Sequence, residues 1–439
     1  MFSMEVWALI MFGIAMLALM IGYPVAFTLG SIAALFGTIF LGLDFFELLP
    51  LRIWGVMTNF TLLAVPLFIF MGIVLEKSGL AEDLLETMAL LFGKIRGGLA
   101  LSVVIVGALL AATTGVVGAT VVTMGVIALP AMLKHNYSPE LATGTIAASG
   151  TLGQIIPPSI VLILLADVIG VPVGRLFVGA VVPGFLLILL FILYISYVAW
   201  RNPETAPVIK SSSTDKLTSR VIKSLLPPLL LIIAVLGSIF FGIASPTESA
   251  AIGSLGALIL AALHKRLSLT NLLESSRHTT RLTSMVFLIL IGATTFGLVF
   301  RGMGGDQLVE NLFSNLPGGT WGFIILSMAL IFFLGFFLDF LEICFIVVPI
   351  LAPIANQMGI DLLWFAILIA VNLQTSFMTP PFGFSLFYLK AVAPKEIKIQ
   401  QIYRGIIPFV LIQIVAILLI AFFPELILWL PDFMDTLQR

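Results

Sequence analysis

The sequence predicts an all-α polytopic membrane protein in which an inverted-topology repeat contributes two re-entrant hairpins and two broken helices. Three observations support this class: an apolar composition, a doubled pattern of Gly and Pro, and basic residues confined to alternate loops. Of the 439 residues, 60% are hydrophobic and only 10% are charged. A soluble domain carries roughly a quarter charged residues, so most of this surface is expected to face a lipid bilayer.

Apolar segments of membrane-spanning length occur in both halves of the chain. Crossing hydrocarbon takes about 20 apolar residues, and we expect no cleavable signal because the first segment lacks a basic flank. In the first half the segments are 5–22, 24–42, 60–77, 98–133, 139–168 and 173–200. In the second half they are 224–243, 247–264, 282–302, 320–356, 361–392 and 402–424.

A polar stretch, 201–223, separates the halves and is expected to be a cytoplasmic linker. The first repeat, 1–200, divides into scaffold helices with an arm (1–97), a hairpin with a broken helix (98–168) and a helix (173–200). The second repeat, 224–439, divides in the same way into 224–319, 320–392 and 402–424.

The same Gly and Pro landmarks recur in the same order in both halves, at offsets of 221 to 226 residues. The matches are Gly22-Tyr23-Pro24-Val25 with Ala244-Ser245-Pro246-Thr247, Gly97-Gly98 with Gly318-Gly319, Pro157-Pro158 with Pro380-Pro381, and Gly179 and Pro183 with Gly405 and Pro408. Since the order is preserved throughout, we interpret the halves as an internal repeat.

Two segments, 98–133 and 320–356, are too long for one straight crossing of about 20 residues. Small or polar residues interrupt them at 112–115 and 335–339. We interpret both as hairpins that enter and leave on one side. The first half then crosses the membrane an odd number of times, which inverts the second half, as in many secondary transporters.

The basic residues test this topology. With both termini on the periplasmic side, only Arg52, Arg175, Arg301 and Arg439 of the 21 basic residues fall outside. Cytoplasmic loops carry the excess of Lys and Arg in membrane proteins. If the long segments were single crossings, Lys134 would leave the face that holds Lys94, so the charge bias favours the hairpins.

Two stretches are amphipathic. In 80–95 the apolar residues Leu80, Leu84 and Met88 share one helical face, and Glu82 and Glu86 lie on another. This pattern is typical of a helix lying on a membrane surface, and a simple connecting helix is an equal alternative. The stretch 45–57 has a weaker form of the same pattern.

Several function classes are excluded. The single cysteine, Cys344, leaves no internal disulfide or multi-thiolate metal site, and the net charge of −1 gives nucleic acid no electrostatic attraction. The chain has no transition-metal ligand spacing, nucleophile elbow or phosphate-binding loop. We therefore expect neither an enzyme nor an ATPase, which leaves an ion gradient as the driving force.

Polar residues concentrate where the backbone is expected to break inside the membrane. Ser149-Gly150-Thr151 and Gln154 precede Pro157-Pro158-Ser159, and Gln374-Thr375-Ser376 precede Thr379-Pro380-Pro381. Proline removes backbone donors and stops a helix, and the freed carbonyl and hydroxyl oxygens suit a hard cation. The positive ends of half-helices suit an anion. The alternative is a kink satisfied by neighbouring Ser and Thr.

Four ionisable residues have separate interpretations. Asp339 lies in an apolar stretch, where a carboxylate is a functional candidate, with sodium coordination its simplest role. Glu342, one turn on, is expected to share this role or to line an outer cavity, and the alternative for both is a carboxylate near the interface. Glu248 follows Ser245 at the start of a helix, so capping is its leading explanation. Arg301 is expected to reach the outer interface, or to contact an external partner or an acidic substrate.

The chain resembles, over essentially its whole length, the large membrane subunit of tripartite ATP-independent periplasmic (TRAP) transporters. The stretches that carry the resemblance are GYPVAF at 22–27, NFTLLAVPLFIFMG at 59–72, GQIIPPS at 153–159 and SPTE at 245–248. The resemblance implies a multi-pass protein of the bacterial inner membrane and an elevator mechanism. It implies sodium-coupled uptake of an organic acid, a small four-helix membrane subunit and a periplasmic binding protein, without any other cofactor.

By that resemblance, sodium binds at the hairpin tips and breaks, and substrate lies between them. The implied sodium ligands are Thr113, Thr114, Gly115, Gly150, Gly335, Asp339, Thr375 and Thr379. The implied substrate contacts are Ser149, Thr151, Gln154, Ser159, Gln374 and Ser376. Two alternatives remain open: a stand-alone sodium and carboxylate symporter, and a membrane channel or scaffold without coupled transport.

Overall fold

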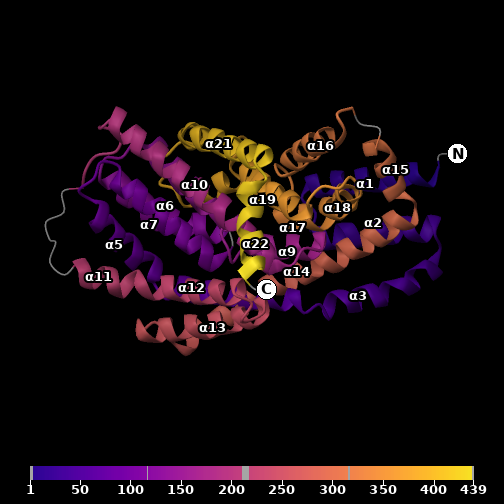
Figure 1. The fold of residues 1–439 in the computed structure, drawn as a ribbon, viewed down its shortest axis with the longest axis horizontal. Coiled ribbons are helices and arrows are strands. Elements are labelled where there is room, and N and C mark those ends of the chain that lie inside the picture. Colours follow the sequence, from indigo (N-terminus) through magenta and orange to yellow (C-terminus); the bar gives the residue numbers. More distant parts are fainter. Residues whose placement is uncertain (1–2, 116, 210–216, 315–316, 438–439) are drawn as a thin grey trace.

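The computed structural model describes residues 3–115, 117–209, 217–314 and 317–437, and every regular element in these ranges is helical. Eight helices are long and apolar enough to cross a membrane, or up to nine if the bent pair 43–57 and 61–77 counts as one span. The chain is therefore a multi-pass membrane protein, as its composition predicts (Figure 1).

The helices of the first half follow the predicted segments closely. They are α1 (Met4–Ile21), α2 (Val25–Phe40), α3 (Leu49–Met57), α4 (Ala64–Lys77), α5 (Leu80–Phe92), α6 (Gly98–Thr114), α7 (Val117–Lys134), α8 (Pro139–Thr151), α9 (Ile160–Ile169) and α10 (Val173–Arg201), with short 3₁₀ turns η1 (Leu43–Leu48), η2 (Thr61–Leu63) and η3 (Leu152–Gln154). The interruptions predicted inside 98–133 and 139–168 are present as the α6–α7 and α8–α9 breaks.

The second half repeats this order with differences at its ends. Its helices are α11 (Leu217–Ser224), α12 (Leu226–Phe240), α13 (Pro246–Leu263), α14 (Leu269–Gly302), α15 (Gly305–Ser314), α16 (Gly319–Leu334), α17 (Phe340–Glu342), the π-helical η4 (Ile343–Val347), α18 (Val348–Gln357), α19 (Leu362–Met378), α20 (Phe384–Val392), α21 (Ile399–Phe422) and α22 (Glu425–Leu437). Three helices were not predicted: α15, α22 and α11, most of which lies in the stretch predicted as a linker (201–223). The helix α14 begins at Leu269 rather than at 282.

The amphipathic helix α5 packs against protein. Leu80, Leu84 and Met88 are buried, Glu82 and Glu86 are exposed, and α5 contacts α6 and α11. Its apolar face is therefore covered, which favours the connecting-helix alternative over a helix that lies on the bilayer.

Two groups of helices surround the broken elements. In one group α14 contacts α2 and α4, and α4 contacts α13; in the other, α6, α7 and α21 each contact α8. In Figure 1, α5, α6 and α7 lie toward one end of the molecule, α2, α15 and α16 toward the other, and α9, α17 and α19 between them.

Two glycines allow a close crossing of α8 and α21. A Cβ on Gly144 of α8 would lie 2.1 Å from the carbonyl oxygen of Gly405 in α21, and one on Gly405 would lie 2.0 Å from that of Glu140. No side chain can occupy either position without moving backbone. The two glycines thus bring the N-terminal half of α8 into direct backbone contact with α21.

Candidate functional site

Two breaks interrupt helices in the middle of the molecule. The first separates α8, which ends at Thr151, from α9, and Pro157-Pro158 lies between them. The second separates α19, which ends at Met378, from α20, and Pro380-Pro381 lies between them. Both Pro-Pro bonds are cis. Two adjacent prolines remove two backbone N–H donors, which disfavours a helix that continues through either break.

Each hairpin tip lies against one of these breaks. Gly115 ends α6 in a left-handed conformation (φ 59°), and a Cβ there would lie 3.3 Å from the backbone nitrogen of Ile160, at the start of α9. Gly335 follows α16, and a Cβ there would lie 2.1 Å from the hydroxyl oxygen of Ser376, at the end of α19. The glycines therefore allow hairpin and broken helix to touch.

A buried amide of the second half meets a buried hydroxyl of the first half between the breaks. The Gln374 Nε2 donates to the Thr151 Oγ1 at 3.3 Å, and both side chains are fully buried. The Gln374 Oε1 and both amide atoms of Gln154, which is also fully buried, have no hydrogen-bond partner. An unpaired buried polar group costs about 1–3 kcal/mol. These three amide atoms are therefore available to a ligand.

The hydroxyl groups at the breaks donate to backbone carbonyls of their own segments. Thr151 donates to Ala148 at 2.8 Å, Ser159 to Gln154 at 2.9 Å and Thr375 to Val371 at 2.8 Å. Because each hydroxyl has one proton and two lone pairs, this arrangement leaves oxygen lone pairs free to accept. Oxygen atoms with free lone pairs suit a hard cation.

Other predicted site residues share these hydrogen-bond patterns or lie beside them. Ser149 packs against Gly107 of α6, and Gly150 against Val121 of α7. Thr379, the C-cap of α19, donates to the Thr375 carbonyl at 2.7 Å. The side chains of Thr113 and Thr114 lie outside the described part of the structure.

Asp339 forms its hydrogen bonds within its own hairpin. Its carboxylate caps α17, accepting from the Phe340 N–H at 2.7 Å, and the Glu342 carboxylate accepts from the Asp339 N–H at 3.1 Å. The two residues form a capping box. A capping role thus accounts for both carboxylates, and no hydrogen bond of the described residues joins either one to Thr375.

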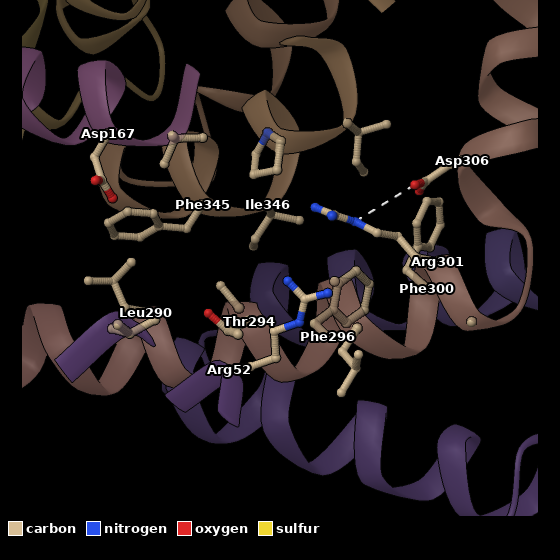
Figure 2. A pocket seen from close by; sticks show the side chains of 18 of the residues that line it. Arg52, Asp167, Leu290, Thr294, Phe296, Phe300, Arg301, Asp306, Phe345 and Ile346 are labelled. Atoms are coloured by element: carbon tan, nitrogen blue, oxygen red, sulfur yellow. Dashed lines mark ion pairs between the residues drawn. The ribbon is translucent and has the colours of Figure 1, made fainter. Parts of the chain in front are cut away.

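Glu248 and Arg301 have defined partners. Glu248 forms a capping box with Ser245 at the start of α13, its Oε2 accepting from the Ser245 N–H at 2.8 Å, so capping is confirmed. The Arg301 Nε lies 3.7 Å from the Asp306 Oδ2. Arg301 also borders a separate cavity with Arg52 and Asp306 (Figure 2).

Two polar contacts that were not predicted join segments far apart in the sequence. The Asn59 Nδ2 donates to the Asp167 Oδ1 at 2.6 Å, and the Thr123 Oγ1 donates to the Glu76 Oε1 at 2.9 Å. Asp167 lies in the apolar helix α9, so the criterion that selected Asp339 would also have selected it. No sequence signal pairs Asn59 with it, because 108 residues separate them.

A multi-pass helical protein with paired helix breaks and unpaired polar atoms between them has the architecture of a secondary transporter. The family model of the tripartite ATP-independent periplasmic transporter, DctM component, matches residues 12–426. The chain belongs to this family, as its resemblance predicted, and is a transporter permease rather than an enzyme.

Curated relatives include large permeases with different printed substrates. The C4-dicarboxylate TRAP transporter large permease DctM of Pseudomonas aeruginosa is 30% identical over 88% of this chain and 90% of its own. The sialic acid TRAP transporter large permease SiaM of Vibrio cholerae is 30% identical over 94% and 95%.

Solved structures share the fold. The YdaH transporter of Alcanivorax borkumensis matches with a TM-score of 0.64 over 94% of this chain and 99% of its own, at 14% identity. MtrF of Neisseria gonorrhoeae matches with a TM-score of 0.59 over 89% and 85%, also at 14% identity. At this identity the likeness concerns the fold alone.

Proposed function

We propose that this permease imports an organic acid into the cytoplasm, driven by sodium ions moving down their gradient, after a periplasmic binding protein delivers the acid. The substrate class is a carboxylate such as a dicarboxylate or a keto acid. The names of the C4-dicarboxylate and sialic acid relatives support an acidic substrate.

The observation that carries the proposal is the buried polar cluster between the two breaks. Gln154 and Gln374 provide unpaired amide atoms, and Thr151 connects the halves. Amide N–H groups can donate to a carboxylate, and amide and hydroxyl oxygens can hold a hard cation beside it. In the membrane interior such unsatisfied groups persist only when a ligand or water engages them.

Within this cluster we divide the ligands by chemistry. Hydroxyl and backbone oxygens at the tips and breaks are proposed to hold sodium, with Asp339 as the charged member on the second hairpin. The remaining amide and hydroxyl groups are proposed to contact substrate. The sodium set is Thr113, Thr114, Gly115, Gly150, Gly335, Asp339, Thr375 and Thr379; the substrate set is Ser149, Thr151, Gln154, Ser159, Gln374 and Ser376.

An inverted repeat is supported by the recurring order of elements. The hairpin helix α6 begins at Gly98 and α16 at Gly319, 221 positions later; the broken helix α8 begins at Pro139 and α19 at Leu362, 223 positions later. With 17 and 16 residues, α6 and α16 are shorter than the about 20 residues of a span. Short helices that turn at glycine support re-entrant hairpins.

An elevator movement is supported by the contacts between helices. We assign 1–97 and 224–319 to a fixed scaffold, and 98–200 and 320–424, on either side of the linker 201–223, to a moving core. Asn59 and Glu76 of the scaffold each bond one residue of the core, Asp167 and Thr123. Two such bonds can exchange as one body slides, whereas a large buried ion-pair network would resist movement.

The proposed setting is the bacterial inner membrane, with both termini periplasmic and the basic loops inside. A small four-helix membrane subunit and a periplasmic binding protein are the proposed partners, in keeping with the large-permease names of the relatives.

The test is reconstitution in liposomes. We expect uptake of a radiolabelled acid only with the permease, its small subunit, the loaded binding protein and an inward sodium gradient together. Equal uptake without the binding protein would indicate a stand-alone symporter. Conductance without sodium dependence would indicate a channel, and either result would contradict the proposal.

A further inference from the structure

A second cavity lies apart from the helix breaks. It has a volume of about 490 Å³ and lies between α14, the end of α9 and the η4–α18 part of the second hairpin. Its walls are mainly aromatic and aliphatic, including Phe296, Phe300 and Phe345. Its polar groups are Arg52, Thr294, Arg301, Asp167 and Asp306. A mostly apolar cavity with a few convergent polar groups is typical of a small-molecule site.

The two arginines reach this cavity from different helices. Arg52 comes from α3 and Arg301 from the end of α14, and Figure 2 shows both guanidinium groups directed into the space between them. Among the described residues the Arg52 guanidinium has no ion pair or hydrogen bond. Guanidinium groups bind carboxylates through paired N–H donors, so two of them in one cavity favour an organic anion.

The two carboxylates of the cavity differ in how closely they are paired with neighbouring side chains. The Asp167 Oδ1 accepts the Asn59 amide at 2.6 Å and is already paired. Asp306 approaches only the Arg301 Nε, at 3.7 Å, which is longer than the 2.7–2.9 Å of a charge-assisted hydrogen bond. Burial raises the pKa of Asp306, Arg301 opposes this shift and Glu310 adds to it. Asp306 therefore binds Arg301 weakly and leaves its terminal N–H groups available.

From this geometry we infer a receiving site for the carboxylate of the transported acid, formed by Arg52 and Arg301 and distinct from the polar cluster at the breaks. It rests on the proposed function. By the predicted topology both arginines are on the periplasmic side, where an acid arrives before transport. The Asp306 carboxylate competes with the ligand for Arg301. It pairs with Arg301 when the site is empty and is displaced by a carboxylate that binds both guanidinium groups.

Protection of an introduced cysteine from N-ethylmaleimide tests whether the acid binds to the permease when the periplasmic binding protein is absent. The native Cys344 is buried, so Thr294→Cys in the cavity supplies the reporter and the exposed Phe423→Cys the control. The permease in lipid nanodiscs is labelled with N-ethylmaleimide in the presence of succinate, N-acetylneuraminate or uncharged dimethyl succinate. We expect at least one of the acids, but not the diester, to slow labelling of Thr294→Cys, and neither acid to affect Phe423→Cys.

Substitutions of the charged residues are each expected to move the acid concentration for half protection in a defined direction. Arg52→Gln or Arg301→Gln should raise the acid concentration for half protection about tenfold, the effect of losing a charge-assisted contact. Asp306→Asn should lower it, because the competitor is removed. Arg175→Gln is the matched control, since Arg175 pairs with Asp432 at 3.0 Å outside the cavity.

Absence of protection by both acids, or equal protection in the Arg52, Arg301 and Arg175 variants, would overturn the inference. A raised half-protection concentration in Asp306→Asn would also overturn it. Liposome uptake in the same preparation separates the two proposals: intact sodium-driven uptake without protection refutes only the receiving site, whereas absent uptake refutes the proposed function.

Discussion

The amide of Gln374 provides the sharpest test of the polar cluster, because its loss should impair transport without weakening the fold. Its Nε2 makes one long bond to Thr151, at 3.3 Å, and its Oε1 is buried without a partner. Gln374→Leu removes a hydrogen bond worth about 0.5–1.5 kcal/mol and an unsatisfied group that costs about 1–3 kcal/mol. The two terms together change the expected free energy of unfolding by between about −0.5 and +2.5 kcal/mol, with a central expectation of a gain of about 1 kcal/mol.

Asn372 supplies a matched control two residues earlier on α19. Its Nδ2 donates to the Met328 carbonyl at 2.7 Å, so this amide is satisfied. Asn372→Leu removes this hydrogen bond, while the Met328 carbonyl keeps its helical bond within α16, so the protein should be destabilised by about 0.5–1.5 kcal/mol. Both substitutions replace a side-chain amide with leucine. They differ because the Asn372 amide donates a short hydrogen bond in the ligand-free protein, whereas the Gln374 Oε1 has no partner.

The measurements are thermal unfolding in detergent and sodium-driven uptake in liposomes. Gln374→Leu is expected to match or exceed the wild-type unfolding temperature while uptake falls about tenfold, as for a lost ligand contact. Asn372→Leu is expected to unfold earlier and to transport at a rate that follows the amount of folded protein. The reasoning is refuted if Gln374→Leu is the less stable variant and transports normally.

Three further outcomes follow from other contacts. Gly144→Ala should prevent stable folding in unfolding measurements, because its Cβ would lie 2.1 Å from a backbone oxygen of α21. Gly30→Ala is the control: its Cβ has nothing within 4 Å, so this substitution should be neutral or stabilising by about 0.5–1 kcal/mol. Asp339→Asn keeps an N-cap acceptor but loses its charge, so the sodium concentration for half-maximal uptake should rise about tenfold with little change in stability. Oxidising an Asn59→Cys and Asp167→Cys pair should arrest uptake until a reductant is added, because these positions lie on opposite sides of the proposed sliding boundary.

Each of these outcomes has a contradicting result. Normal folding of Gly144→Ala would mean that α8 and α21 can separate there. An unchanged sodium response in Asp339→Asn would restrict that residue to capping α17. Uptake that continues while the Asn59 and Asp167 positions are cross-linked would exclude movement between them.

The sequence predicted what depends on local chemistry. Long apolar runs located the spans, and the Pro-Pro pairs located both breaks, because two adjacent prolines remove two backbone donors and disfavour a continuing helix. Glu248 was correctly interpreted as a cap from Ser245, three residues earlier. The helix α22 was missed because Pro431 and its acidic residues obscure its apolar pattern, although the helix accommodates that proline.

The sequence could not predict what depends on distant contacts. Asn59 and Asp167 are 108 residues apart, and Thr151 and Gln374 are 223 apart. Such residues come together only in the folded protein, and the hydrophobic periodicity of the sequence does not predict which of them pair. The capping box of Asp339 is local, and the spacing of Asp339 and Glu342 could have predicted it. The apolar residues around the carboxylate predicted ion binding instead.

The proposed repeat is symmetric in its backbone and asymmetric in its side chains, and this combination suits a carrier of a cation with an anion. At the offset of 223 that joins Thr151 to Gln374, Pro157 corresponds to Pro380, so both halves break at equivalent points. At the same offset Gln154 corresponds to Phe377. Equivalent breaks provide backbone oxygens from both sides, whereas the amides are distributed unequally. An organic acid with unlike ends requires that inequality, because a fully symmetric cluster would bind it equally well in two opposite orientations.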